Sequence, residues 1–501
     1  MTRGDRQVVV IGVGDLRNNR ERTPEQAVEP LDLIDRAIVL ATDDAGIDRA
    51  ALADVDAVGV VQVVSWAYDD VSASVAGRIG ALAAKSTVSE VGGHQPVAVL
   101  TELAAKIATG EADLAVLCGG EAQASLELLG AAKDPAAAAD WSHSPGGPGK
   151  FSRATGGTER MWDLGLVAPI RIYPLWENRL RHDLGMSFAE SQAWSGQMYS
   201  RFSEVAATRE AAWNQEAVSA EEITTTEGRN RMICYPYPLL MNALNRVDQA
   251  AAVLLASVER ADALGIPEEK RVYVDAGAVD TDSEDVLERQ TYGRAPGLER
   301  SLDTALELAG ATAADLDVVD LYSCFPIVPK LGALHLGLDR DAELTTTGGL
   351  TSFGGPHNNY SSHALVSAVQ KLRATGGTGL VFANGEYLTK HATTILRTEK
   401  PEHGFSWSIV TEDENPPFTV DDTWVGPLEI ETFTVEFDRE GVPARGYVIG
   451  LNPDGARVGI RVSKDDTATM NTLVDPEGDP IGLAGRVVTA GERRLFTLGA
   501  E

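Results

Sequence analysis

The chain has 501 residues, which is long enough for two or three domains with sizeable buried cores. Its composition is that of an ordinary globular protein, with 44% hydrophobic and 23% charged residues, but its formal net charge is −31. Because binding to nucleic acid requires a concentrated basic face, this acidic composition argues against a nucleic-acid partner.

The cysteines and the N-terminus indicate the cellular compartment. Cys118, Cys234 and Cys324 are odd in number and widely spaced, which argues against a disulfide framework and against a zinc site. The apolar run Val8–Val13 is too short for the core of a signal peptide, and no stretch approaches the roughly 18 apolar residues that span a bilayer. The sequence therefore predicts a cytoplasmic protein with no membrane span and no metal.

Strands and helices alternate along the first part of the chain. Short apolar runs at Val8–Gly12, Ala57–Val61 and Leu114–Leu117 are typical of buried strands. Helical periodicity marks Leu31–Ala45, and a second helix is predicted over Pro96–Thr109. Such alternation is typical of parallel βαβ units in which the sheet is buried on both faces.

A segment of different composition interrupts this pattern. Ala131–Gly157 is rich in Ala, Ser, Pro and Gly and predicts an exposed connection. The Trp, Tyr and Met residues between Met161 and Tyr237 then predict a helical layer that is inserted over the main sheet.

The alternation resumes after this insertion, with strands predicted at Val272–Val274, Asp317–Leu321 and Gly379–Phe382. The two α/β regions also share a repeat. After Ala108-Thr109-Gly110, a leucine lies six residues and a glycine eleven residues beyond Ala108. The same residues lie at the same two distances beyond Ala374 in Ala374-Thr375-Gly376.

A Gly-Gly turn precedes the helix in both copies of this repeat, at Gly92-Gly93 and at Gly354-Gly355. The matched order of turn, helix, Ala-Thr-Gly and strand predicts a duplicated α/β half. In such a duplication Asp113–Gly119 and Gly379–Asn384 are equivalent strands.

The sequence pattern changes again after Pro401. Phe433–Phe437 alternates apolar and polar residues, and similar short runs follow at Gly446–Gly450, Val458–Val462 and Gly485–Val488. Short strands separated by turns predict a small antiparallel β-barrel. The predicted domains are an N-terminal α/β half at 1–124, a helical insertion at 125–250, a C-terminal α/β half at 251–398 and a β-rich domain at 399–501.

Three segments of the chain resemble the thiolase superfamily. Gly92–Ala122 is similar to the nucleophile helix and the strand after it. Asp320–Phe325 is similar to the His-Asp-Cys-Phe segment of sterol-carrier-protein thiolases, and Gly348–Ala364 to their turn with Gly-His-Pro. The resemblance covers about residues 5–397 and implies an α/β fold that is a duplicated thiolase fold. With its β-rich extension the chain resembles the mycobacterial thiolase-like type 1 group.

The resemblance also implies that the residues of thiolase chemistry have been lost. The nucleophilic cysteine corresponds to Gly93, the acid/base cysteine to Ala383 and the oxyanion-binding histidine to Gly355. The histidine of His-Asp-Cys-Phe is replaced by Tyr322, and its aspartate by Ser323. Because nucleophile and acid/base groups act as a unit, thiolase catalysis should be absent.

Polar residues nevertheless remain at strand ends and Gly-rich turns that converge in this fold. The candidate acid/base residues are Tyr322, Tyr360 and His357, and the candidate substrate-binding residues are Gly93, His94, Gly355, Asn358, Asn384 and Gly385. Simpler roles stay open: helix capping for the histidines and asparagines, and ordinary core packing for the tyrosines and Cys324.

Three functions are compatible with these observations. The first is an acyl-CoA-binding member of the acetyl-CoA acetyltransferase superfamily in lipid metabolism, a monomer or homodimer without a tightly bound cofactor, whose ligand is CoA or an acyl-CoA. The second is a CoA-thioester retro-aldolase with Tyr322 and Tyr360 as acid/base groups and the β-rich domain over the mouth of the site. The third is a non-enzymatic scaffold whose β-rich domain binds another protein.

Overall fold

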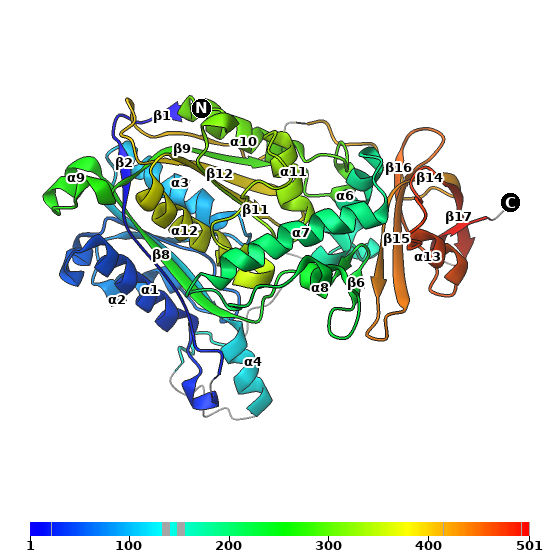
Figure 1. The fold of residues 1–501 in the computed structure, drawn as a ribbon, viewed down its shortest axis with the longest axis horizontal. Coiled ribbons are helices and arrows are strands. Elements are labelled where there is room, and N and C mark those ends of the chain that lie inside the picture. Colours follow the sequence, from blue (N-terminus) through cyan, green and yellow to red (C-terminus); the bar gives the residue numbers. More distant parts are fainter. Residues whose placement is uncertain (22, 133–140, 148–155, 414, 492, 500–501) are drawn as a thin grey trace.

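The computed structural model describes residues 1–21, 23–132, 141–147, 156–413, 415–491 and 493–499, so most of the predicted connection Ala131–Gly157 lies outside the described residues. Its main body is built on one eleven-stranded sheet (Figure 1). Nine strands follow one path, in the spatial order β10 (Val318–Leu321), β11 (Thr378–Gly385), β12 (Lys390–Arg397), β9 (Val272–Thr281), β2 (Val8–Arg17), β8 (Asp248–Ser257), β5 (Leu114–Ala122), β3 (Ala57–Val60) and β4 (Lys85–Val88). The two others lie beside β9, where β13 (Ser406–Ile409) pairs with β9 and β1 (Thr2–Arg3) pairs with β13.

The path contains two copies of one topology, joined where β2 pairs with β9. In the N-terminal copy β5 pairs parallel with β3 and antiparallel with β8. In the C-terminal copy β11 pairs parallel with β10 and antiparallel with β12. The predicted duplication is therefore confirmed, with Asp113–Gly119 and Gly379–Asn384 in equivalent strands.

Two inner helices, α3 (Gln95–Ala108) and α12 (Tyr360–Thr375), pack against each other and against strands of both copies. Both are apolar on most sides, as expected for helices that are enclosed by protein. The outer faces are covered by α1 (Pro30–Ala45) and α2 (Val71–Ile79) in the first copy, and by α10 (Pro296–Ala309) and α11 (Ile327–His335) in the second. The short helices α4 (Gln123–Ala132) and α9 (Val258–Ala263) complete this body.

The segment between β5 and β8 forms the predicted helical layer. It contains α5 (Glu159–Leu164), α6 (Pro169–Asp183), α7 (Phe188–Ala207), α8 (Ala220–Thr224) and the short strands β6 (Met232–Cys234) and β7 (Tyr237–Pro238). Aromatic residues of α6 and α7 share one apolar core with the C-terminal copy, including Trp176, Phe202 and Phe325. Among the described residues no helix has the length and apolarity that crossing a membrane requires.

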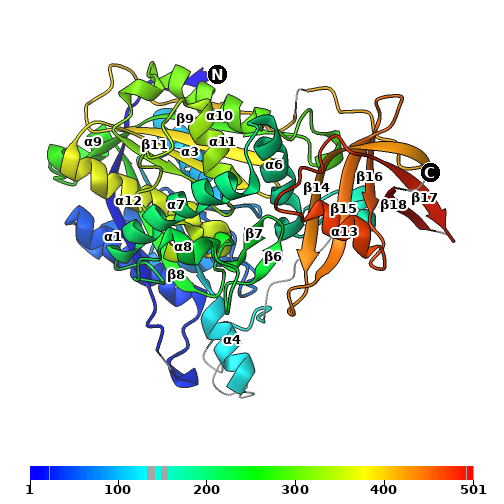
Figure 2. The same cartoon turned by 45° about the vertical axis from the view of Figure 1, so that its right-hand side comes forward.

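The C-terminal region forms a separate antiparallel sheet, as predicted (Figure 2). Its spatial order is β16 (Arg457–Arg461), β15 (Pro443–Leu451), β14 (Gly426–Phe437), β17 (Ala484–Ala490) and β18 (Arg493–Leu498), with α13 (Thr467–Leu473) packed against it. In the described residues the edge regions meet through one isolated bridge, between Val462 and Phe496. The sheet is therefore not closed into the predicted β-barrel, because one bridge does not make a continuous ladder.

The C-terminal sheet is hydrogen-bonded to the insertion. Thr432 Oγ1 donates a hydrogen bond of 2.6 Å to the carbonyl of Leu175, and Asn178 Nδ2 donates one of 2.9 Å to the carbonyl of Phe433. β6 extends the sheet by pairing Cys234 with Glu436. The sheet thus packs on α6, while the domain limits predicted from the sequence stay predictions.

Candidate functional site

A cavity of about 450 Å³ lies where the N-termini of α3 and α12 meet the carboxyl ends of β10 and β11. Helices α5 and α6 of the insertion form another wall. Most of the lining is apolar, with a few polar groups, which is typical of small-molecule sites. The lining residues are Val91, Gly92, Gly93, Gly156, Trp162, Val167, Pro169, Ile170, Tyr173, Asn242, Ala243, Asn245, Tyr322, Cys324, Phe325, Leu350, His357, Asn358, Asn384, Glu386 and Tyr387.

Five of the residues that the sequence singled out lie in this lining: Gly93, Tyr322, His357, Asn358 and Asn384. They come from both copies of the fold, since Gly93 precedes α3 whereas the other four belong to the C-terminal copy. The expected convergence of these segments is therefore present. None of the described residues of the C-terminal sheet lines the cavity, so that sheet does not form its wall.

His94 and Gly385 lie behind the lining and contact each other. A Cβ placed on Gly385 would come within 2.2 Å of His94 Nδ1, so the absence of a side chain at 385 makes room for the imidazole. Burial, with smaller contributions from Lys390 and His391, lowers the pKa of His94 to about 3. His94 is therefore a neutral, packed side chain rather than part of the cavity wall.

Gly355 also lies outside the lining, behind three residues that belong to it. A Cβ at this position would meet Asn245 at 3.0 Å and Ala243 and Leu350 at 3.5 Å. The predicted oxyanion position is thus separated from the cavity by side chains of the insertion and of the Gly-rich turn.

Gly93 is the residue on which the shape of the cavity depends most. A Cβ at position 93 would lie 2.3 Å from the hydroxyl oxygen of Tyr322 and 2.6 Å from the backbone oxygen of Asn384. Both distances are far below any van der Waals contact. The Tyr322 hydroxyl therefore lies where a side chain at 93 would begin, and the two residues fit together only because position 93 is glycine.

Tyr360 lies behind Tyr322 rather than in the cavity. The two rings meet edge to face with their centroids 5.6 Å apart, and Tyr360 is fully buried. Its hydroxyl accepts a 3.0 Å hydrogen bond from the amide of Gly349. The candidate acid/base residue Tyr360 is therefore not among the lining residues, because its hydroxyl is turned to the Gly-rich turn.

Burial raises the pKa of Tyr322 well above that of free tyrosine, with Cys324 and Tyr360 adding to the effect. The hydroxyl therefore stays protonated over the whole physiological range. Tyr322 can donate a hydrogen bond to a ligand, but the lowered pKa that a tyrosine base requires is not found here.

His357 occupies a strained position in the cavity wall. Its φ of 44° lies in the left-handed region, which is uncommon for a residue other than glycine. Burial lowers its pKa to about 4, so the ring is neutral at pH 7. The neighbouring Asn358 is structural, since it accepts from the amide of Gly92 at 2.9 Å and donates to the carbonyl of Gln62 at 2.9 Å.

Asn384 is linked to Cys324 and to Tyr173, a lining residue that the sequence did not single out. Its amide nitrogen donates to the hydroxyl of Tyr173 at 2.7 Å and lies 4.0 Å from the sulfur of Cys324. Burial raises the pKa of Cys324 to about 12. The cysteine is therefore a thiol and offers no thiolate nucleophile.

Glu386 is a further lining residue that the sequence analysis missed. Burial raises the pKa of its carboxyl group, and Lys390 partly offsets this effect through a 3.3 Å contact with Oε1. Glu386 and Leu388 have φ values of 49° and 54°, so the turn after β11 is strained. A carboxyl group with a raised pKa in an apolar cavity is a candidate for acid/base chemistry.

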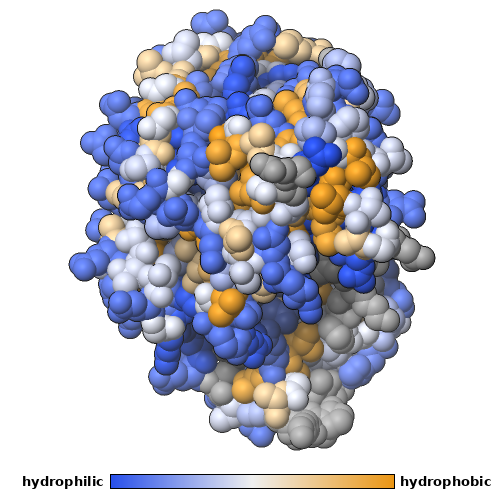
Figure 3. Space-filling view, turned by 90° about the vertical axis from the view of Figure 1, so that its right-hand side faces the viewer, coloured by the Kyte–Doolittle hydropathy of each residue, from blue (hydrophilic) through white to orange (hydrophobic). Residues whose placement is uncertain are grey.

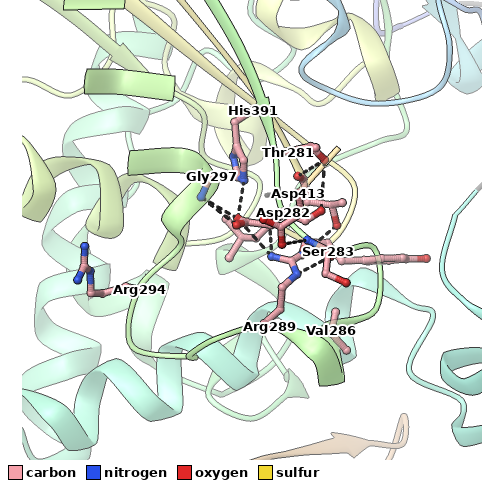
Figure 4. Close-up of polar contacts among 12 residues, drawn as sticks. Thr281, Asp282, Ser283, Val286, Arg289, Arg294, Gly297, His391 and Asp413 are labelled. Atoms are coloured by element: carbon pink, nitrogen blue, oxygen red, sulfur yellow. Dashed lines mark hydrogen bonds and ion pairs between the residues drawn. The ribbon is translucent and has the colours of Figure 1, made fainter. Parts of the chain in front are cut away.

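A buried polar network holds this strained turn in place (Figure 4). Arg289 donates to the carbonyl of Leu388 at 2.6 Å and to the hydroxyl of Thr389 at 2.8 Å. Asp282 lies 3.5 Å from Arg289 and accepts from the amide of Gly297 at 2.9 Å. The network therefore ties the start of α10 to the turn that carries Glu386.

Four lining residues each contain a buried polar atom without a hydrogen-bond partner in the described part of the chain: Asn242 Oδ1, His357 Nε2, Asn384 Oδ1 and Glu386 Oε2. Buried polar atoms are nearly always satisfied, so such a group of them in one cavity indicates that a polar ligand or water completes the site. No cluster of three or more potential metal ligands is found among the described residues.

Comparison with known proteins identifies the family. A monomeric SCP2-thiolase like protein type 1 from Mycobacterium smegmatis has 30% sequence identity to this chain and a TM-score of 0.81, over 98% of this chain and 99% of that protein. The family profile described as thiolase-like protein type 1 additional C-terminal domain matches residues 409–492. The chain belongs to the thiolase-like protein type 1 family.

Two further proteins are similar to part of this chain. An acetyl-CoA acetyltransferase from Syntrophomonas wolfei is 31% identical over 137 residues, which are 27% of this chain and 32% of that protein. The chain thus matches about a third of the length of this relative. The Ltp2-ChsH2(DUF35) aldolase has 19% identity and a TM-score of 0.59 over 78% of this chain and 97% of its own, which shows likeness of fold.

Membership of this thiolase-like family gives the geometry at Gly93 a chemical meaning. Thiolases carry their nucleophilic cysteine at this helix start, where the amide dipoles of the helix favour the thiolate. Here the hydroxyl of Tyr322 lies within 2.3 Å of the point where a cysteine side chain would begin. In this packing a cysteine at position 93 and the tyrosine at position 322 therefore exclude each other.

Placing a cysteine at this position (Gly93→Cys) should therefore give a less stable protein and no acyl-enzyme. The clash with Tyr322 and with the backbone of Asn384 should cost about 1–3 kcal/mol, as overpacking does. Urea unfolding measures the loss, and intact mass after incubation with acetyl-CoA detects acylation. Gly77→Cys is the control, because a side chain at Gly77 in α2 meets no atom within 4 Å. Acylation at position 93 with unchanged stability would contradict the packing argument.

Proposed function

We propose that this protein binds a CoA thioester in the cavity and does not catalyse the thiolase reaction. The observation that supports the proposal most is the group of unpartnered polar atoms in an otherwise apolar cavity of about 450 Å³ at the starts of α3 and α12. The acetyl-CoA acetyltransferase among its relatives acts on such a thioester by its name. CoA is then a ligand, not a tightly bound cofactor.

Tyr322 is the residue that receives the thioester in this proposal. Its protonated hydroxyl can donate a hydrogen bond to the carbonyl oxygen, as fixed donors do in oxyanion sites. The acyl chain packs against apolar lining such as Ile170 and Phe325. Without a thiolate at 93, the thioester stays intact. We also propose a monomer, as the M. smegmatis relative is described, that works in the cytoplasm in lipid metabolism.

Binding is tested by titrating acetyl-CoA and longer acyl-CoAs while thermal unfolding is followed. A ligand at about 100 times its Kd should stabilise the protein by about 2.7 kcal/mol. Filling the cavity with Val167→Trp should abolish the stabilisation, whereas the control Leu334→Trp, at a residue of α11 that is 41% exposed, should not. Tyr322→Phe should weaken it, because the ring remains and only the donor is lost. No stabilisation by any CoA compound would leave the scaffold function as the better account.

A second candidate, retro-aldol cleavage of a 3-hydroxyacyl-CoA, is favoured by one observation, the Glu386 carboxyl group in the same cavity as the Tyr322 hydroxyl. Glu386 would take the proton of the 3-hydroxyl group while the bond between C2 and C3 breaks. The electron pair passes to the thioester enolate, which Tyr322 stabilises by its hydrogen bond, and C2 is then protonated. Tyr360 would support Tyr322 through ring packing rather than transfer a proton, since its hydroxyl bonds to Gly349.

A further inference from the structure

A second hollow, of about 1360 Å³, lies between α5, the start of α6 and strands β15, β16 and β18 of the C-terminal sheet. We call it the basic groove. In a chain with a net charge of −31 it gathers seven cationic side chains and four carboxylates. The basic residues are Arg160, Arg171, Arg445, Arg461, Lys464, Arg493 and Arg494. Figure 3 shows the face that the C-terminal sheet presents as mostly hydrophilic, with apolar side chains in separate patches.

Three of these cations already have carboxylate partners. Arg160 pairs with Asp285 at 2.7 Å, and Arg171 and Arg445 share Glu436, at 2.8 and 3.1 Å. The charge of these three side chains is therefore already balanced within the protein.

The other four cations have no carboxylate partner among the described residues: Arg461, Lys464, Arg493 and Arg494. Arg461 donates to the carbonyls of Leu164 and Asp163, at 2.6 and 2.7 Å, and Arg494 donates to a carbonyl at 3.0 Å. All four come from the C-terminal sheet and the loop after β16. Arginine and lysine side chains that form no ion pair are suited to phosphate groups, which arginine binds through paired N–H donors.

The basic groove and the cavity lie on two sides of the same short helix. In α5, Trp162 lines the cavity whereas Arg160 and Leu164 line the groove. At the start of α6, Ile170 lines the cavity and Arg171 the groove. An α-helix with its side chains is about 10 Å across, so roughly one helix diameter separates the two hollows.

We infer that the basic groove binds the phosphate groups of the CoA whose thioester lies in the cavity. The inference rests on the proposed function, and it extends that function to the C-terminal sheet. CoA has an uncharged pantetheine arm between its thioester and its phosphorylated nucleotide, so its two ends need an apolar site and a cationic site. The acidic chain would repel such an anion elsewhere, which makes a local group of cations without carboxylate partners necessary.

The test compares acetyl-CoA with acetylpantetheine, which has the same thioester and no phosphate. Calorimetry measures the Kd of both for the wild-type protein and for the variant Lys464→Gln/Arg493→Gln, whose two side chains form no hydrogen bond or ion pair with the described part of the chain. The control is Arg36→Gln/Lys371→Gln, which removes the same charge from exposed sites on α1 and α12.

Wild-type protein should bind acetyl-CoA more tightly than acetylpantetheine, and the difference should shrink as salt screens the phosphates. The groove variant should bind acetyl-CoA about tenfold more weakly, since a charge-assisted hydrogen bond contributes about that factor, with acetylpantetheine unchanged. The control variant should match the wild type. Unchanged affinity for acetyl-CoA in the groove variant, with both ligands bound, overturns this inference alone. Absence of binding of both ligands to wild-type protein overturns the proposed function and this inference with it.

Discussion

Replacing Lys330 with methionine should lower the free energy of unfolding by about 3–5 kcal/mol, which is the usual cost of leaving a buried charge without its partner. Lys330 in α11 is fully buried and forms an ion pair with Glu177 of α6. Its ammonium group also donates to Ser195 of α7 at 2.7 Å. Methionine keeps the length of the side chain, so the lost stability comes from the removed charge and not from a cavity.

The control for this prediction removes both charges. In Glu177→Gln/Lys330→Met no buried ion remains, and a large part of the lost stability should return, because neutral glutamine can still meet Ser191 and Tyr237. Lys371→Met, at an exposed site, should change stability by less than about 0.5 kcal/mol. Urea unfolding gives all the free energies. A single variant as stable as the wild type would show that this pair does not hold the insertion to the C-terminal copy.

The parts of the fold that local sequence patterns determine were predictable. The strands β5 and β11 are continuous apolar runs followed by glycine, and each follows a helix with the same Ala-Thr-Gly end, so the duplication is visible in the chain. The strands β8 and β12 were not predicted. Each is antiparallel to its neighbour in the same copy and is not preceded by a crossover helix, so alternation of strands and helices gives no signal for them.

The open form of the C-terminal sheet, in place of the predicted barrel, could not be predicted either. Alternation of apolar and polar residues along Phe433–Phe437 predicts a strand with one buried face, whereas Phe433, Thr434 and Val435 are all buried, and Cys234 of β6 lies 2.9 Å from Thr434. It does not fix whether β16 and β18 meet, because that depends on the twist and bend of the whole sheet. Strand β6, which joins this sheet from the distant insertion, has no local signal at all.

The candidate site was predictable to the extent that its residues lie in recognisable segments. Gly93 and Tyr322 line the cavity because helix starts and strand ends converge in this fold. Tyr173 comes from an insertion without a recognisable motif. Glu386 lies in a strained turn that contains neither Asn nor Pro, and the contacts of Arg289, about 100 residues earlier in the chain, hold that turn. A turn that is held by a residue so far away along the chain cannot be recognised from its own sequence.

If the protein cleaves 3-hydroxyacyl-CoA, Glu386→Gln should reduce the cleavage rate by about 10²–10⁴-fold, the usual contribution of a general base. Glutamine has nearly the same shape as glutamate and can still meet the ammonium group of Lys390 through its carbonyl oxygen. The change therefore removes the proton acceptor while the turn keeps its contacts. The rate is measured by the release of the carbonyl product and of the shorter acyl-CoA, and binding of the substrate should change little.

The pH profile and a matched control variant show whether Glu386 acts as a general base or only stabilises the structure. Because burial raises the pKa of Glu386, the carboxylate is lost at higher pH than for an ordinary glutamate, whose pKa is 4.5. The wild-type rate should therefore fall as the pH decreases, with an apparent pKa above 4.5. The residual rate of Glu386→Gln should not show this fall at acidic pH. Glu90→Gln removes a carboxylate that also lies near Lys390, at 3.6 Å, but outside the cavity lining, and it should leave rate and profile unchanged. A Glu386→Gln variant with the wild-type rate, or with the same acid limb, would show that another group accepts the proton.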